Sequence, residues 1–227
     1  MSASGNGFTE TTFTWFRDLT QNNTSNWFAE HRETFQAHVE EPFGHLLEDV
    51  TRRLADTAVP LRGGAATTFR INRDVRFSAD KSPYATHRSA VLTASGTKAE
   101  SGGLVYVQLA ADGGLLAGGL YKPQTAQLDP VRQRIVDDPD RFDAVVAELA
   151  SKGHLLDRSE VVKTMPRGYT EHGDRSYADH LRLKQLVVMQ PLPKATWLDD
   201  SVADRVRDFA VGVAPLLGFV RAAVAAA

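Results

Sequence analysis

The sequence predicts an α+β protein in which helices pack on one face of a mostly antiparallel sheet. The first quarter of the chain repeats apolar residues at helical spacing, whereas the middle alternates apolar and polar residues between glycine turns. Helical stripes return toward the C-terminus. No repeat and no change of composition marks a domain boundary. We therefore expect a disordered N-terminus at residues 1–7 and a single domain over residues 8–227.

Three helices are expected in the N-terminal quarter. Phe13, Phe16 and Leu19 lie on one helical stripe, which predicts a helix over roughly residues 9–20. A second helix follows the polar turn at residues 21–25. A third begins at Pro42, because proline suits the first helical turn, where its missing amide proton is not needed. Its apolar residues recur at i, i+3, i+4, i+7 and i+11, namely Phe43, Leu46, Leu47, Val50 and Leu54.

An antiparallel sheet is expected in the middle of the chain. The sequence Asp112-Gly113-Gly114 is typical of a hairpin turn between two strands. Gly118-Gly119 in the second of these strands indicates a bulge, or a place where another group approaches the backbone closely. The predicted strands cover residues 67–71, 90–93, 105–109, 115–121 and 186–189.

Proline positions guide the prediction of the later helices. Asp129-Pro130 and Asp138-Pro139 each place a capping acid before a proline, so a helix is predicted to begin at each pair. The last helix contains Pro215, which is expected to kink or split it because proline removes a helical hydrogen bond.

Composition excludes several classes of protein. The chain has no cysteine, which rules out disulfides, thiolate metal sites and cysteine nucleophiles, and fits a reducing cytoplasm. A net charge of −2 gives no overall attraction to nucleic acid. No apolar run of about 18 residues predicts a membrane span, and the N-terminus lacks the features of a signal peptide. No phosphate-loop, zinc-protease or serine-hydrolase motif is present, so no metal and no cofactor is predicted. We expect a cytoplasmic protein with a small-molecule ligand or a protein partner.

Residues 69–88 concentrate positive charge in a chain that is otherwise acidic. The stretch from Arg70 to Arg88 carries a local charge of +3. Since the whole chain carries −2, the remainder carries −5. Guanidinium groups close together repel one another unless a negative group lies between them. The surplus therefore indicates an anionic ligand, since guanidinium forks bind carboxylate or phosphate through paired hydrogen bonds. The charged residues are Arg70, Arg73, Arg76, Lys81 and Arg88, with Asp74 and Asp80.

Two hypotheses for this segment follow from the residues, and the sequence leaves both open. In the first, the protein is a small enzyme or binding protein for a phosphate- or carboxylate-bearing molecule. The residues assigned to ligand binding are Arg70, Arg73, Arg76, Asp80 and Lys81. Those assigned to catalysis are Tyr84, His87 and Asp74, with histidine the only side chain here that ordinarily titrates near neutrality. In the second hypothesis, the protein is a non-enzymatic interaction module whose arginines brace the structure through ion pairs or dock an acidic partner.

Strand alternation constrains the geometry of the segment. In a regular strand over residues 67–73, Arg70 would point away from the core and Arg73 toward it. The two arginines share a face only if the strand ends or bulges near Asn72. We expect the strand to end near Arg73 and an ordered loop to follow through Pro83.

A second polar cluster lies at residues 166–169, Pro-Arg-Gly-Tyr. A Pro-x-Gly sequence is typical of a turn. The alternative is that this loop folds over the Arg-rich segment and adds Arg167 and Tyr169 to the ligand-binding residues.

The spacing of the Arg-rich segment also resembles the signature of a known family. The pattern R-x-x-R-D-x-R-F-x-x-D-K-x-P-Y runs from Arg70 to Tyr84 and is followed by Thr86-His87. It is similar to that of an uncharacterised bacterial family, also found in some fungi, that is known only as a domain of unknown function. The resemblance covers nearly the whole chain and implies a shared site without implying a reaction. Members often carry lysine where this chain has Thr86, so the charge near the site differs here.

Overall fold

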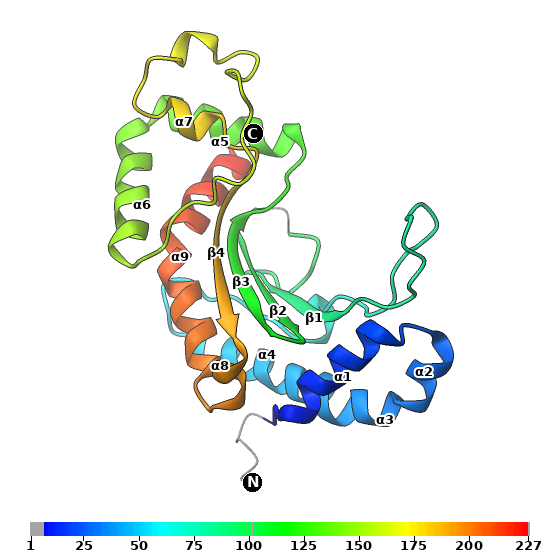
Figure 1. Cartoon of the computed structure of the whole chain (residues 1–227). Coiled ribbons are helices and arrows are strands. Elements are labelled where there is room, and N and C mark those ends of the chain that lie inside the picture. Colours follow the sequence, from blue (N-terminus) through cyan, green and yellow to red (C-terminus); the bar gives the residue numbers. More distant parts are fainter. Residues whose placement is uncertain (1–6, 101, 227) are drawn as a thin grey trace. The chain divides into compact units, whose positions relative to one another are not determined.

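The computed structural model describes residues 7–100 and 102–226. It confirms the α+β class, with helices and a four-stranded antiparallel sheet in the order β1-β2-β3-β4 (Figure 1). Of the predicted disordered N-terminus, residues 1–6 lie outside the described part. The strands are β1 (His87–Leu92), β2 (Leu104–Ala110), β3 (Gly113–Leu120) and β4 (Leu186–Pro193).

The predicted helices are present at both ends of the chain. The first group is α1 (Glu10–Gln21), α2 (Ser25–Glu30), α3 (Arg32–Phe35), the π-helical turn η1 (Gln36–Glu40) and α4 (Glu41–Leu54). The second group is α5 (Thr125–Asp137), α6 (Pro139–Ser151), α7 (Ala178–Leu181), α8 (Lys194–Leu198) and α9 (Val202–Ala225). Two short 3₁₀ turns are η2 (Ala65–Thr67) and η3 (Thr170–His172).

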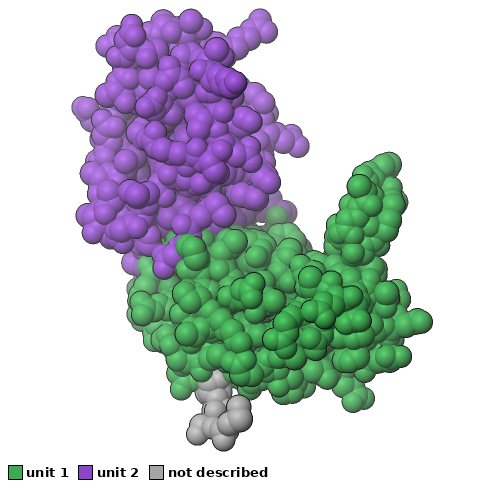
Figure 2. Space-filling view, viewed as in Figure 1, with its two compact units in different colours: residues 1–98, 106–116, 191–209 green, residues 99–105, 117–190, 210–227 purple. Residues whose placement is uncertain are grey.

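The chain divides into two compact units, coloured separately in Figure 2. Unit 1 contains α1–α4, β1 and the whole Arg-rich segment. Unit 2 contains α5–α7 and the Pro166–Tyr169 turn. The assignment of residues 8–227 to a single domain stays a prediction. The units comprise residues 1–98, 106–116 and 191–209, and residues 99–105, 117–190 and 210–227, respectively.

An aromatic cluster forms the core of the N-terminal helices in unit 1. The indole of Trp15 packs against the rings of Phe16, Phe28 and Phe35, at centroid distances of 5.2, 5.7 and 4.8 Å. Phe28 also stacks on Tyr84, with ring centroids 4.1 Å apart and an interplanar angle of 18°. Buried aromatic pairs of this kind are worth about 0.5–1.5 kcal/mol beyond their area burial. The helical layer therefore anchors the segment that carries Tyr84.

The predicted start of a helix at Pro130 is wrong, and the predicted split at Pro215 is absent, whereas the predicted kink there stays a prediction. Helix α5 begins at Thr125, so Pro130 lies inside it rather than at its start. Proline costs that helix the bond to Ala126, in its first turn, while buried Leu128 and Ile135 hold the helix in place. Helix α9 continues through Pro215 without splitting. Tertiary packing outweighs the local helix penalty at both sites.

The predicted strand over residues 67–71 is also not formed as a regular strand. Residues 65–67 make the 3₁₀ turn η2, and single bridges join Thr68 to Ala90 and Asn72 to Tyr84. The pairing is antiparallel, as expected, but interrupted.

Helix α9 is long and apolar enough to cross a membrane, judged by length and composition alone. Half of its most apolar stretch is buried inside the protein. A core helix of a soluble protein passes the same test, so this helix is weak evidence for a membrane span.

Candidate functional site

The Arg-rich segment forms an irregular antiparallel hairpin, which we call the Arg-rich hairpin (residues 69–88). Backbone hydrogen bonds join its two sides: Phe69 N donates to Ser89 O at 2.9 Å, and Arg73 N donates to Pro83 O at 2.8 Å. Beyond that last bond, residues 74–82 form a tip that projects from unit 1 (Figures 1 and 2). The two sides therefore pair only through isolated bridges and single hydrogen bonds up to Arg73, and not through the regular strand that was expected to end there.

The guanidinium of Arg73 binds partners within the hairpin. Its Nη1 donates to Asp80 Oδ2 at 2.5 Å and to the backbone oxygen of Ser82 at 3.0 Å. Ser82 in turn donates its hydroxyl and its amide to Asp80 Oδ1, at 2.6 and 2.9 Å. The Ser82 hydrogen bonds, with Arg73, lower the pKa of Asp80 to about 2. These three residues close the neck of the tip.

This arrangement predicts an acid titration of the hairpin. The pKa of Asp80 in the folded protein, about 2, lies below its ordinary value of 3.8. The stabilisation from Asp80 is therefore complete above pH 3.8 and is lost as the pH falls through about 2. Carboxyl NMR titration should give that midpoint, and the Ser82 amide signal should follow it. Ser82→Ala should raise the midpoint, because the Ser82 hydroxyl is the largest cause of the shift; an unchanged midpoint would contradict this account.

Two further cations of the motif also bind partners within the tip. Arg76 Nη2 and Nε donate to the Asp74 carboxylate at 2.7 and 3.0 Å. Lys81 Nζ donates to Val75 O at 2.9 Å. Their charges hold the tip in shape, which agrees with the hypothesis of a structural brace for this part of the motif.

Arg70 differs from the other arginines of the motif. It makes no hydrogen bond or ion pair to any residue in 7–100 or 102–226, although its charge helps Arg76 to lower the pKa of Asp74. Arg70 lines a pocket of about 310 Å³ together with His87. The remaining lining residues are Phe69, Ala85, Ser89 and Tyr106. The structure thus brings together one predicted ligand-binding residue and one predicted catalytic residue at an open surface pocket.

His87 is the titratable group of this pocket. It is half-buried at the start of β1, and burial lowers its pKa below the ordinary value of 6.5. The ring is therefore neutral at neutral pH and can accept a proton or a hydrogen bond.

The pocket wall contains two aromatic rings, and a second cation, Lys98, lies beside one of them without lining the pocket. The rings of Phe69 and Tyr106 lie 6.3 Å apart, centroid to centroid, and Phe69 is 40% exposed. Lys98 Nζ lies 5.7 Å from the centre of the Phe69 ring and donates to Thr68 O at 2.9 Å. The wall can therefore bind both an anion and a flat apolar group.

The other predicted catalytic residues lie elsewhere. Tyr84 is buried against Phe28, and Asn23 holds its backbone by donating to Tyr84 O and accepting from Tyr84 N, at 2.9 and 3.1 Å. Asp74 lies in the tip, beside Arg76. Neither lines the Arg70–His87 pocket.

The two site residues predicted from the second cluster belong to unit 2. Arg167 is exposed in a turn that Gly168 permits, since Gly168 has φ +89°. Tyr169 is buried and donates its hydroxyl to Asp129 O at 3.1 Å, and burial, with Asp129, raises its pKa. The turn prediction is confirmed, and the contribution of both residues to a ligand site stays a prediction.

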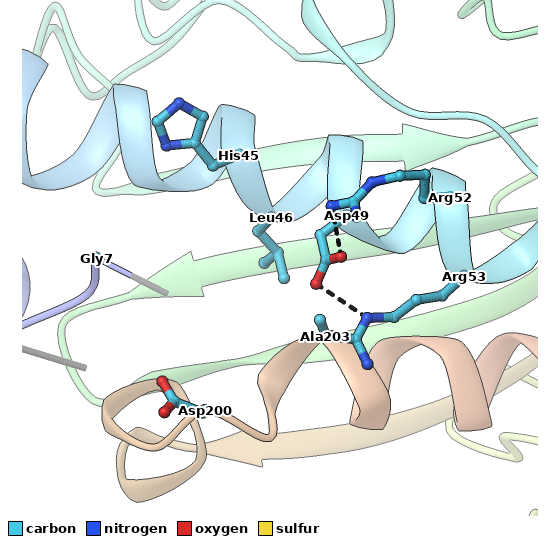
Figure 3. Close-up of a pocket in the computed structure, with 8 residues that line it drawn as sticks. All are labelled: Gly7, His45, Leu46, Asp49, Arg52, Arg53, Asp200 and Ala203. Carbon is cyan, nitrogen blue, oxygen red and sulfur yellow. Dashed lines mark hydrogen bonds and ion pairs between the residues drawn. The ribbon is translucent and has the colours of Figure 1, made fainter. Parts of the chain in front are cut away.

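A second pocket, of about 460 Å³, lies beside α4 and is shown in Figure 3. Its charges compensate one another: Asp49 lies between Arg52 and Arg53, at 2.8 and 2.9 Å. With these cations paired, the pocket is a weaker candidate for an anion site than the one at Arg70. In the described part of the chain, no group of three or more histidine or acidic residues could hold a metal ion.

Sequence reasoning did not identify the walls of the Arg70–His87 pocket. Tyr106 alternates with buried Val105 and Val107 along β2, so the sequence predicts that its side chain points away from the core. The sequence does not predict which residues its ring contacts there. The position of Lys98 over the Phe69 ring, next to the pocket, has no local signal either, because it depends on how a loop folds back onto Thr68.

The fold and pocket define an α+β protein with an open pocket at Arg70 and His87 of a braced hairpin. The model of a family described as "Conserved hypothetical protein (DUF2461)" matches residues 11–219. The chain therefore belongs to this family, whose description names no activity. No curated protein and no solved structure matches the chain.

Proposed function

We propose that the protein binds the carboxylate or phosphate group of a small organic molecule in the Arg70–His87 pocket. One observation carries this proposal. Arg70 reaches a cavity without a hydrogen-bonding partner in the described residues, whereas Arg73 and Arg76 each hold a carboxylate. A guanidinium left in this way can form charge-assisted hydrogen bonds to an incoming anion.

The remaining lining residues favour an organic ligand over a bare inorganic ion. Phe69 and Tyr106 offer aromatic surface, and a volume of about 310 Å³ lies at the lower end of the range for small-molecule sites. If the protein is an enzyme, His87 is the residue in this pocket that can accept a proton. The proposal places the protein in the cytoplasm of a bacterial cell, which the absence of cysteine supports.

The alternative of a non-enzymatic module has support of its own at other positions. Arg73, Arg76 and Lys81 all bind groups within the hairpin. We propose that they brace the tip rather than contact the ligand, so that one motif contains both a ligand residue and a brace.

Replacing Arg70 with alanine is expected to weaken ligand binding by about 10- to 100-fold, because each charge-assisted hydrogen bond contributes about 1.5–3 kcal/mol. Thermal-shift screening against inorganic phosphate, sugar phosphates, nucleotides and organic acids would find a ligand, and calorimetry would give its affinity. Folding should be unaffected, since Arg70 is exposed.

Arg76→Ala is the matched control for this experiment. It removes an exposed arginine of the same motif that pairs with Asp74 and lies outside the pocket. We expect its ligand affinity to equal that of the unaltered protein. Equal losses in both variants, or no loss in Arg70→Ala, would rule out the proposed role of Arg70.

A further inference from the structure

The tip of the Arg-rich hairpin presents a phenylalanine to solvent. Phe77 is 96% exposed. The turn that carries it is held by the Asp74–Arg76 ion pair and by Lys81, which donates to the oxygen of Val75. Single exposed apolar residues are common on protein surfaces. A fully exposed aromatic ring on a braced and projecting turn is a shape suited to insertion into another surface.

The same unit contains a pocket of about 370 Å³ at the base of the hairpin, which we call the base pocket. Its floor is apolar and consists of buried side chains: Phe28, Phe35, Ile71 and Tyr84. Arg32 and Glu33 lie at its rim. Within the described residues, neither of these two charges makes a hydrogen bond or an ion pair, although Arg32 lies over the Phe28 ring at 5.7 Å.

We infer that a second copy of this chain fills the base pocket with its Phe77, and that the exchange is reciprocal. When two projecting hairpins lie side by side and antiparallel, the tip of each one reaches the base of the other. Phe77 is at the tip, whereas Ile71 and Tyr84 line the pocket at the base. A two-fold axis then makes both contacts at once, as in an isologous dimer.

Charge on the two surfaces fits the same pairing. Asp74 and Arg76 precede Phe77 on the tip, and Arg32 and Glu33 border the pocket that would receive it. Both surfaces therefore carry charges of both signs, since Asp80 and Lys81 also belong to the tip, and oppositely charged groups can face one another in one register of the two copies.

This inference does not depend on the proposed anion site. The Arg70–His87 pocket and the base pocket have no lining residue in common. A result that disproves the dimer would therefore leave the proposed ligand site unaffected. A result that disproves the ligand site would likewise leave the dimer unaffected.

Sedimentation velocity over a range of protein concentrations tests the inference first. We expect a monomer–dimer equilibrium in the unaltered protein. Phe77→Ser should raise the dimer dissociation constant by about 100-fold or more, since two phenylalanines leave a buried environment. Leu155→Ser is the matched control, because Leu155 is also an exposed apolar residue, at 72%, and lies outside the hairpin. A protein that stays monomeric up to its solubility limit, or that dimerises equally well as Phe77→Ser, overturns the inference.

A disulfide test identifies the contacting residues directly. The chain has no cysteine of its own, so any disulfide must form between the introduced thiols. Ala79→Cys places one thiol at the exposed tip, and Gln36→Cys places one at the edge of the base pocket. Mild oxidation of a mixture of the two variants should give the mixed disulfide dimer in excess over either symmetric dimer. Statistical proportions of the three dimers would mean that the tip does not enter the base pocket, and would overturn the inference.

Discussion

Replacing Arg88 with methionine is expected to lower the free energy of unfolding by about 3 kcal/mol. The Arg88 side chain is only 8% exposed. It donates to the carboxylate of Glu40 and to the backbone oxygen of Phe69. Methionine fills a similar volume but leaves Glu40 without its counter-charge and Phe69 without a donor. Removing Arg88 costs more than the pair contributes, because the Glu40 side chain is only 33% exposed and its charge is then poorly solvated.

Thermal unfolding measures this effect. In a chain of this size each kcal/mol corresponds to about 2–4 °C, so the midpoint should fall by about 6–12 °C. Arg52→Met is the control, since its side chain is 78% exposed and its ion pair to Asp49 is of the surface kind, worth about 1 kcal/mol or less. The double variant Glu40→Leu/Arg88→Met should recover part of the loss. If Arg88→Met melted at the temperature of Arg52→Met, Arg88 would not be a brace.

Arg88 shows why the charge excess of the motif is an incomplete guide to a ligand site. Arg88 is one of the five cations of the segment, but its partner is Glu40, which lies 48 residues away in the sequence. Whether a guanidinium is paired depends on tertiary neighbours of this kind, which spacing cannot reveal. Only the folded structure distinguishes Arg70, which lines an open pocket, from the ion-paired Arg73, Arg76 and Arg88.

Local signals predicted the elements well where local chemistry determines them. Asp138 accepts a hydrogen bond from Arg141 N at 3.2 Å and caps α6, which begins at Pro139 as predicted. The predicted start of α1 at about residue 9 likewise lies within a residue of its observed start, Glu10. Pro130 was misplaced because the same Asp-Pro pattern occurs inside α5, where the packing of buried side chains determines the start of the helix.

The paired glycines of β3 were predicted to mark a close backbone approach, and this is confirmed. Gly119 has φ +132°, and a Cβ at this position would lie 2.1 Å from the backbone oxygen of Leu186 in β4. Gly119→Ala is therefore expected to cost about 3 kcal/mol. Part of that cost is the strain of a left-handed conformation, and part is the displacement of β4.

A control separates the two parts of that cost. Gly153 also has a positive φ, of +76°, but no atom lies within 4 Å of a Cβ placed there. Gly153→Ala should therefore show the strain alone, about 1 kcal/mol. Urea unfolding gives both values, and amide exchange at Val187, the neighbour of Leu186, should accelerate only in Gly119→Ala. Equal losses in the two variants would mean that backbone strain, and not the contact with Leu186, accounts for the glycine. A larger loss of stability in Gly119→Ala than in Gly153→Ala would show that β3 can pair with β4 only because position 119 has no side chain.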